Sequence, residues 1–247
     1  MSRPPGSDAR LAVSTVIFAL EPGVTPDGVE HEASGPRSLW IPLVRRLRGP
    51  GKDRWALPGG WLGAGEALET AAARTLEETT GVTPAYLEQL YTFGSPDRSP
   101  GERVVSVVYW ALVRPEETTG AIDDPNVRWF DPDSLPPLAF DHNLIVEYAL
   151  ARLRTKLGYS QIAHAFLDET FTLAELREVY ETVLRRPLDP ANFRRTVEAS
   201  GALVETGEVR TGTPHRPPKL YRPAEPADAG ANGLFRVPIA PHLRKQS

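Results

Sequence analysis

Two stretches of the sequence hold residues whose types and spacing could do chemistry. The first runs from residue 57 to residue 82 and reads LPGGWLGAGEALETAAARTLEETTGV. Its adjacent glycines predict a turn that lets the backbone come close to a ligand, and its second half predicts a helix that ends at a glycine C-cap. The residues that define this pattern are Gly59, Gly60, Glu66, Arg74, Glu78 and Gly81.

The second stretch is basic and lies between residues 188 and 222. Arginine can bond guanine edges and phosphates, and asparagine can bond adenine. A proline-stiffened basic tip suits contact with the minor groove or the DNA backbone. The candidate DNA-binding residues are Asn192, Arg194, Arg195, Arg216, Lys219 and Arg222. The alternative is a small helical lid or dimerisation module with a solvated basic face.

The elements that must position the first stretch are mostly strands. Runs rich in apolar and β-branched residues predict strands at Leu11–Leu20, Ser38–Leu47, Tyr86–Phe93, Val104–Val113 and Val127–Phe130. One helix is predicted between them, over Ala67–Thr79. This order indicates a mixed α/β (α+β) domain over residues 1–150.

The elements around the second stretch are helical. Apolar spacing predicts a connecting helix over His142–Leu157, followed by helices at Tyr159–Leu167, Leu173–Leu184 and Pro190–Ala199. Thr172 with Glu175, and Asp189 with Gly201, supply start and stop signals. A hairpin follows, with strands at Leu203–Arg210 and Lys219–Arg222.

Three helices and a hairpin are the order of a winged helix-turn-helix, which places its third helix in the major groove. We expect this domain over residues 151–223 and a disordered tail over residues 224–247. The expected core residues of the domain are Phe166, Leu173, Leu176, Tyr180, Leu184, Phe193 and Val197.

Composition narrows the function classes. The chain has 247 residues and no cysteine, which excludes disulfides, zinc–thiolate sites and cysteine nucleophiles. No apolar run approaches the roughly 18 residues of a membrane span, so we expect a cytoplasmic protein with no membrane partner. Residues 1–150 are net acidic and residues 151–222 net basic. Only the second segment is therefore expected to meet nucleic acid.

The first stretch resembles the Nudix box. In that family a glycine is followed after five residues by Glu, and after seven more by Arg-Glu, an apolar residue, any residue, Glu-Glu, any residue, Gly and an apolar residue. The matching residues are Gly60, Glu66, Arg74, Leu76, Glu78, Gly81 and Val82. The alternative is an ordinary turn followed by an amphipathic helix.

Two departures from the box bear on catalysis. Thr75 and Thr79 stand where the family has Glu, and with Glu78 they share one helix face at i, i+3 and i+4 spacing. The resemblance implies that this face holds Mg²⁺ or Mn²⁺ in active members. Threonine is a poor magnesium ligand, so we expect weak Mg²⁺ binding, no required cofactor and little activation of water. Residual hydrolysis stays open.

Two further segments, QLYTFGSPDRSPGERVVSVVYW at 89–110 and LAFDH at 138–142, resemble the NrtR family, the Nudix-related transcriptional regulators of NAD metabolism. Residues 171–184, 188–195 and 216–222 resemble its C-terminal domain. Guanidinium groups match phosphate oxygens, and one of Arg45 and Arg46, at the end of a strand, could face a pocket. The predicted nucleotide-binding residues are Arg45, Gly59, Gly60, Arg98, Arg103 and His142.

The resemblance implies a homodimeric repressor of NAD biosynthesis or salvage genes. It would bind double-stranded operator DNA, with ADP-ribose or a related NAD metabolite as its signal. Two alternatives remain open. One is a Nudix hydrolase that splits ADP-ribose into AMP and ribose 5-phosphate. The other is an adaptor whose basic module binds protein instead of DNA.

Overall fold

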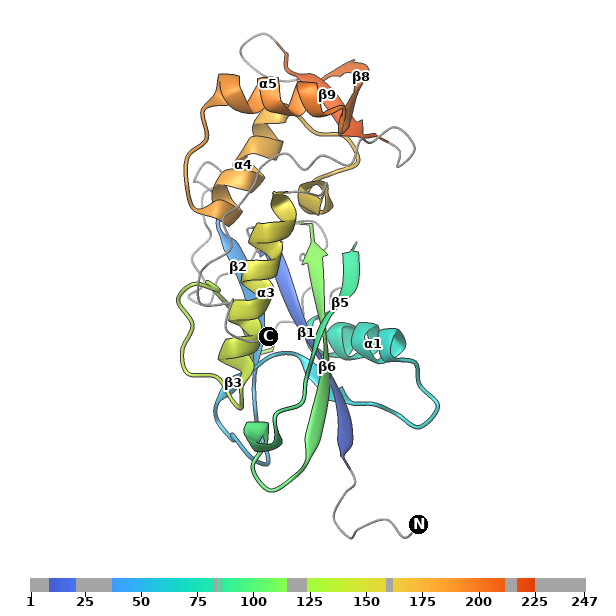
Figure 1. Cartoon of the computed structure of the whole chain (residues 1–247), viewed down its shortest axis with the longest axis vertical. Coiled ribbons are helices and arrows are strands. Elements are labelled where there is room, and N and C mark those ends of the chain that lie inside the picture. The colour runs from blue at the N-terminus through green and yellow to red at the C-terminus, as the bar shows by residue number, and fades with distance from the viewer. Residues whose placement is uncertain are drawn as a thin grey trace. The chain divides into compact units, whose positions relative to one another are not determined.

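The computed structural model describes residues 9–20, 37–81, 84, 86–114, 124–158, 162–211 and 217–224 (Figure 1). The chain divides into two compact units, and each is described by itself. Unit 1 is Met1–Ala33 with Leu39–Ala149, and unit 2 is Ser34–Ser38 with Leu150–Ser247. No helix in the described part of the chain combines the length and apolarity that crossing a bilayer requires.

The strands described in unit 1 form one mixed sheet. They are β1 (Arg10–Leu20), β2 (Leu39–Arg45), β3 (Trp55–Ala56), β4 (Gly59–Trp61), β5 (Tyr86–Phe93), β6 (Val104–Val113) and β7 (Val127–Phe130). The order is β3-β2-β1-β6-β5, with β4 also paired to β1 and β7 to β2. β1 and β6 are parallel, with Val13 opposite Val107, whereas the other pairs are antiparallel.

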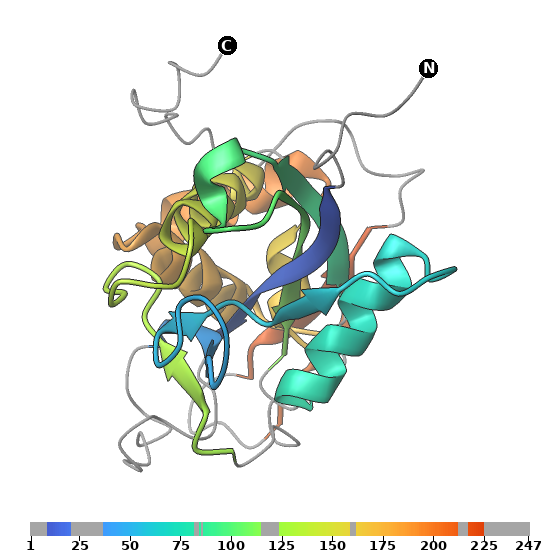
Figure 2. The same ribbon diagram turned by 90° about the horizontal axis from the view of Figure 1, so that it is seen from below.

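Helices cover both faces of this sheet. The sheet lies between α1 (Leu68–Thr80) and the beginning of α3 (His142–Leu157), as Figure 2 shows. Ala71, Ala72 and Leu76 of α1 are buried against side chains from β1 and β6. Because both faces are covered, β1 and β6 are almost continuously apolar, which explains why the sequence identifies them clearly.

Most of these elements begin and end close to their predicted residues. β5, β6 and β7 match their predictions, and α1 ends at Gly81, whose φ of 69° is the left-handed conformation expected of a glycine C-cap.

The turn predicted at Gly59 and Gly60 is wrong, since both residues lie in β4, hydrogen-bonded to β1. Position 59 requires glycine for a different reason. β4 lies so close to β1 that a Cβ on Gly59 would collide with the carbonyl oxygen of Val13.

Unit 2 contains the helices and hairpin that the sequence predicts. Its elements are η2 (Ile162–Phe166), α4 (Leu173–Leu184), α5 (Pro190–Ser200), β8 (Leu203–Val209) and β9 (Lys219–Pro223). The capping box of Thr172 and Glu175 is confirmed, as is the N-cap of Asp189. The helix predicted over Tyr159–Leu167 is, in its described part, a single 3₁₀ segment. Residues 225–247, the predicted tail, lie outside the described residues.

The core of unit 2 is close to the predicted set. Phe166, Leu176, Tyr180, Phe193 and Val197 are buried as expected, and the rings of Tyr180 and Phe193 meet edge to face with centroids 5.5 Å apart. Two expected core residues, Leu173 and Leu184, are only half-buried, at the two ends of α4. Val179 and Val183 are buried in α4 instead.

Candidate nucleotide and DNA sites

A cavity of about 640 Å³ opens in unit 1, within the range of about 300–1,000 Å³ typical of small-molecule sites. Its wall combines the first half of β1, the loop after β2, β4, the loop between β5 and β6, and the start of α3. The polar residues and glycines that matter for a ligand are Arg46, Arg48, Gly59, Gly60, Arg98 and His142.

Four of the six predicted nucleotide-binding residues line this cavity, namely Gly59, Gly60, Arg98 and His142. Arg45 and Arg103 are not part of its wall. Arg45 points to Asp53, with 3.6 Å between charged atoms. Arg103 donates to the carbonyl oxygens of Ser95 at 3.4 Å and Val104 at 3.3 Å.

Arg98 is held beneath the cavity by a bidentate ion pair. Its Nε and one terminal nitrogen donate to the two carboxylate oxygens of Asp141, at 3.0 and 2.8 Å, and only 5% of its side chain is exposed. Arg98 lies in η1 (Pro96–Arg98), and Asp141 directly precedes α3. The pair therefore fixes one wall of the cavity to the beginning of α3, and its own charge is already compensated.

His142 is a buried, neutral side chain of the cavity wall. The backbone N–H of Leu57 donates to its Nδ1 at 2.9 Å, which places the ring proton on Nε2. Burial lowers the pKa of His142 to about 4, the principal cause being desolvation of the charged ring. The residue can thus accept from the backbone and still offer one N–H at neutral pH.

Arg46 and Arg48 line the cavity, although the predicted nucleotide-binding set contained Arg45 in place of Arg46 and did not contain Arg48. Arg46 stacks over Phe140, with 4.8 Å from guanidinium carbon to ring centroid, and its Nε donates to the carbonyl of Pro50 at 2.9 Å. Burial lowers the pKa of Arg46. The sequence indicated that one of Arg45 and Arg46 would face the cavity. The structure places Arg46 there, and Arg48, two residues on, lines the same wall.

In an active Nudix enzyme one face of α1 would hold a metal. Here its polar side chains are already engaged in hydrogen bonds and ion pairs within the protein. Thr75 is buried and donates to the carbonyl of Ala72 at 3.2 Å, and Thr79 donates to the carbonyl of Thr75 at 2.5 Å. Arg74 engages both carboxylates of the motif, Glu66 at 2.7 Å and Glu78 at 3.1 Å.

The electrostatics of this face also disfavour a cation. Hydrogen bonds from Arg74 and from the backbone N–H of Gly63, together with the charge of Arg74, lower the pKa of Glu66 to about 2, so this carboxylate is ionised but already paired. Among the described residues no cluster of three or more His, Cys, Asp or Glu side chains could hold a metal ion. Because Mg²⁺ prefers several charged oxygen ligands, the residues present do not fit a catalytic magnesium.

In unit 2, α5 presents polar side chains on the face opposite its buried one. Asn192, Arg194 and Arg195 are exposed, whereas Phe193 and Val197 pack into the core. Arg194 donates to Glu198 at 2.8 Å, and this hydrogen bond raises the pKa of Arg194. The face has the residue types that a recognition helix needs.

The hairpin carries two of the three predicted wing residues in its described part. Lys219 pairs with Glu205 across the two strands at 2.9 Å, which raises the pKa of Lys219. Arg222 is exposed and donates to the carbonyl of Pro223 at 3.3 Å. Arg216, the third, lies outside the described residues.

A groove of about 240 Å³ runs between α4, α5 and β9. Arg194 and Lys219 line it, as does Arg177 of α4, which sequence reasoning missed. Arg177 is paired with Glu181 one turn away at 3.5 Å. Three cations on one concave surface of unit 2 favour contact with phosphates of a nucleic acid.

Two family models match the chain. The one described as NUDIX domain matches residues 31–151, and the one described as NrtR DNA-binding winged helix domain matches residues 163–222. The ADPR responsive transcriptional repressor NtrR of Acinetobacter baylyi is 35% identical over 217 residues, covering 86% of this chain and 81% of that protein. An ADP-ribose pyrophosphatase of Methanocaldococcus jannaschii is 36% identical over 128 residues, covering 52% and 73%.

Solved structures give the same picture. Shewanella oneidensis NrtR in complex with a 27mer DNA has a TM-score of 0.74 and 33% identity, covering 92% of this chain and 99% of that one. A MutT/nudix family protein from Enterococcus faecalis has a TM-score of 0.69 and 26% identity, covering 91% and 90%. The predicted architecture, a mixed α/β Nudix domain followed by a winged helix domain, is confirmed.

Proposed function

Because this chain belongs to the NrtR family, we propose that it is a transcriptional repressor whose DNA binding is controlled by ADP-ribose. The observation that carries the proposal is that one chain holds both a nucleotide-sized cavity and a winged helix with an exposed Asn192, Arg194 and Arg195 face. Residues 1–150 form the sensing domain, and residues 151–223 read the operator.

The finer parts of the proposal extend the family assignment. We infer a homodimer, in which two copies of α5 would contact a near-palindromic operator whose half-sites are separated by whole helical turns. Its targets are genes of NAD biosynthesis or salvage. As a repressor that binds chromosomal DNA, it is located in the cytoplasm. ADP-ribose acts as an effector and not as a substrate, since Thr75 and Thr79 replace two metal-binding carboxylates.

A gel-shift experiment tests this function directly. Full-length protein is titrated onto promoters of NAD genes at fixed salt, with and without ADP-ribose, and an unrelated promoter serves as the control. We expect a retarded complex on the NAD promoters that ADP-ribose weakens. Equal binding to all promoters, or a complex insensitive to ADP-ribose, would contradict the proposal.

A hydrolase is the second candidate, favoured by the likeness to the Methanocaldococcus jannaschii pyrophosphatase over 52% of the chain. The test is an assay for AMP release from ADP-ribose with Mg²⁺ and with Mn²⁺. The paired carboxylates Glu66 and Glu78 and the two threonines of α1 predict negligible turnover. Rates in the usual enzymatic range, about 1–1,000 per second, would overturn this prediction.

A further inference from the structure

We propose that Arg48, assisted by Arg46, forms a diphosphate-binding site that takes the place of the divalent cation of a Nudix enzyme. ADP-ribose would then bind without metal. The inference rests on the proposed function only in naming ADP-ribose as the natural source of the diphosphate. The site itself follows from the residues and the cavities of unit 1.

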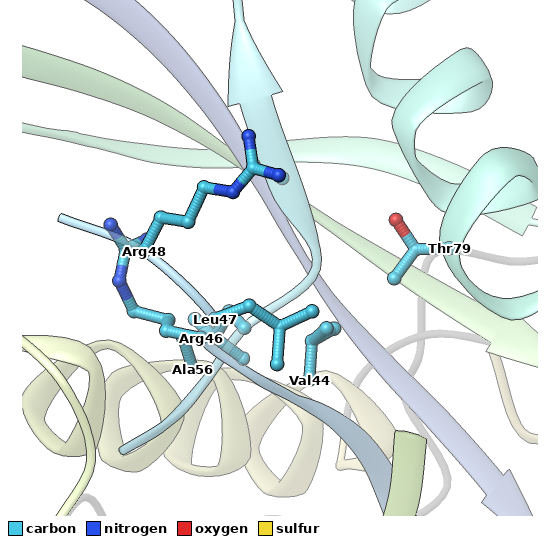
Figure 3. Close-up of a pocket in the computed structure, with 8 residues that line it drawn as sticks. Val44, Arg46, Leu47, Arg48, Ala56 and Thr79 are labelled. Atoms are coloured by element: carbon cyan, nitrogen blue, oxygen red, sulfur yellow. The ribbon is translucent and has the colours of Figure 1, made fainter. Parts of the chain in front are cut away.

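The position of these arginines is the first observation. A smaller cavity of about 210 Å³ lies beside the larger one, and Arg46, Arg48, Leu57 and Gly59 line both. Thr79 of α1 lines the smaller cavity as well. Figure 3 shows the guanidinium of Arg48 pointing toward the side on which Thr79 lies. Arg48 therefore stands between the nucleotide-sized cavity and the α1 face that would hold the metal in an active Nudix enzyme.

The second observation is the charge of this wall. Arg48 is exposed and has no ion-pair or side-chain hydrogen-bond partner among the residues that the structure describes. Other arginines around the cavity are compensated, Arg98 by Asp141 and Arg10 by Glu102. Arg46 has its Nε on a backbone carbonyl, not on a carboxylate. The shared wall thus carries positive charge without a bound counter-charge.

The third observation is the chemistry of the opposite side. A glutamate at position 79 would place a carboxylate in the same small cavity as Arg48 and would neutralise it. Threonine leaves the guanidinium available, and its own hydroxyl proton is already given to the carbonyl of Thr75. A guanidinium without an ion-pair partner beside a neutral threonine is therefore an arrangement that suits an anion.

A diphosphate fits this arrangement better than other anions. Guanidinium groups bind phosphate oxygens in a bidentate manner, with strong charge-assisted hydrogen bonds. Two of them along one wall can span two phosphates. Gly59 lies on the same wall. The diphosphate could belong to a nucleotide sugar or be free pyrophosphate, and the titrations below separate these sources.

Titration calorimetry on the full-length protein tests the site. ADP-ribose, inorganic pyrophosphate and adenosine are each titrated in EDTA and again in Mg²⁺. We expect ADP-ribose to bind equally well in both buffers. Arg48→Gln should weaken its binding by roughly 10-fold to 100-fold, as expected for loss of a hydrogen bond between charged groups, and should leave adenosine binding unchanged. Arg54→Gln, on the same loop but outside both cavities, is the matched control and should bind like the parent.

The outcomes separate this inference from the proposed function. ADP-ribose binding that needs Mg²⁺, or that Arg48→Gln leaves unchanged, overturns the phosphate site while the sensor function stands. Binding of pyrophosphate but not ADP-ribose, with the same dependence on Arg48, supports the site and overturns the effector. If the parent protein binds neither ligand, both proposals fail.

Discussion

Thr75 and Thr79 differ in how far a carboxylate could replace them. Thr75 is buried beside Gly60 of β4, so a longer side chain there would have to displace its neighbours. Thr79 is only half-buried and lines the small cavity that also contains Arg48. A carboxylate introduced at position 79 would therefore form an ion pair with Arg48 in preference to binding a metal.

Thr79→Glu should accordingly weaken ADP-ribose binding in EDTA by several-fold, in the range of a partly exposed ion pair with Arg48. Thr79→Gln is the isosteric neutral control and should have a much smaller effect. Affinity measured by calorimetry in low salt gives the comparison. If the glutamate variant instead bound ADP-ribose more tightly in Mg²⁺ and began to turn it over, the α1 face would still be a metal site.

His142 should make the stability of unit 1 depend on pH. Its pKa is about 4 in the folded chain and 6.5 in the unfolded chain, so the unfolded state binds the proton more readily. Stability is complete above pH 6.5 and falls as the pH drops toward 4, with a slope of at most about 1.4 kcal/mol per pH unit. Denaturant titrations between pH 4 and pH 7 measure this.

His142→Asn is the matched variant, because an amide oxygen can accept the hydrogen bond from the Leu57 N–H without titrating. The slope between pH 4 and 6.5 should diminish in this variant. Glu66 also loses its stabilising contribution as the pH falls, but only from its usual pKa of 4.5 toward about 2, so the slope above about pH 5 reports on His142. An unchanged slope would show that other groups cause it.

At the scale of elements, α5 and the hairpin should contribute to DNA binding in different ways. Arg194→Ala and Arg195→Ala should each weaken operator binding roughly 5-fold to 150-fold if the side chain reads a base. Lys219→Ala should weaken binding evenly across sequences and lower the salt slope by about one. Fluorescence anisotropy on operator and scrambled DNA at several salt concentrations distinguishes the two. If both arginine variants kept full affinity, α5 would not be the recognition helix.

Glu205, the ion-pair partner of Lys219, offers a substitution that should strengthen DNA binding, whereas Lys219→Ala should weaken it. Lys219 must give up Glu205 before it can contact a phosphate. Glu205→Gln removes this competition and one negative charge, so it should tighten DNA binding by a few-fold on operator and scrambled DNA alike. Glu208→Gln, an exposed residue of the same strand, controls for the change in net charge. Equal effects of both variants would assign the gain to net charge alone.

Elements with their own start and stop signals could be predicted from the sequence. Asp189 and Gly201 delimit α5, and the capping box of Thr172 and Glu175 starts α4, because these signals act within a few residues. The short strands β3 and β4 were missed, since two or three residues show no period. Gly59 suggested a turn, whereas the close approach that requires glycine depends on Val13 in another strand.

The sequence predicted a nucleotide site in the first domain, but it could not identify every residue that lines the cavity. His142 and Arg98, which the sequence predicts to bind a nucleotide, both line the cavity, although the partner of Arg98, Asp141, is 43 residues away in sequence and had no local signal. The choice between Arg45 and Arg46 depended on where β2 ends. β2 ends at Arg45, and the loop after it turns Arg46 into the cavity.

For the whole molecule, the question is how ligand and DNA binding influence each other. Arg98 and Asp141 join the cavity loop to the start of α3, and the division between the two units falls within α3, after Ala149. A ligand that moves this loop therefore acts on the segment that continues into unit 2. A coupling of about 1–3 kcal/mol, or 5-fold to 150-fold in affinity, is typical of allosteric proteins.

Reciprocity gives a strict check of this coupling. Operator DNA must weaken ADP-ribose binding by the same factor by which ADP-ribose weakens operator binding. Calorimetry with and without operator measures it, and equal ADP-ribose affinities in both titrations would rule out the sensor. Asp141→Asn keeps the side-chain shape but removes the charge facing Arg98, so it should reduce the coupling factor. Arg152→Gln, an exposed change within α3, should leave that factor unaltered.

The threonines on α1 affect how the occupancy of the pocket depends on the concentration of ligand in the cell. A pocket that releases its ligand intact is read at equilibrium, so the occupied fraction follows the concentration of free ligand and is half-maximal when that concentration equals the dissociation constant. An enzyme built on the same helix would deplete the molecule it detects. If Thr75 and Thr79 abolish turnover, as proposed, the promoter would follow a metabolite pool without draining it, and the signal would last until some other catalyst removed the ligand.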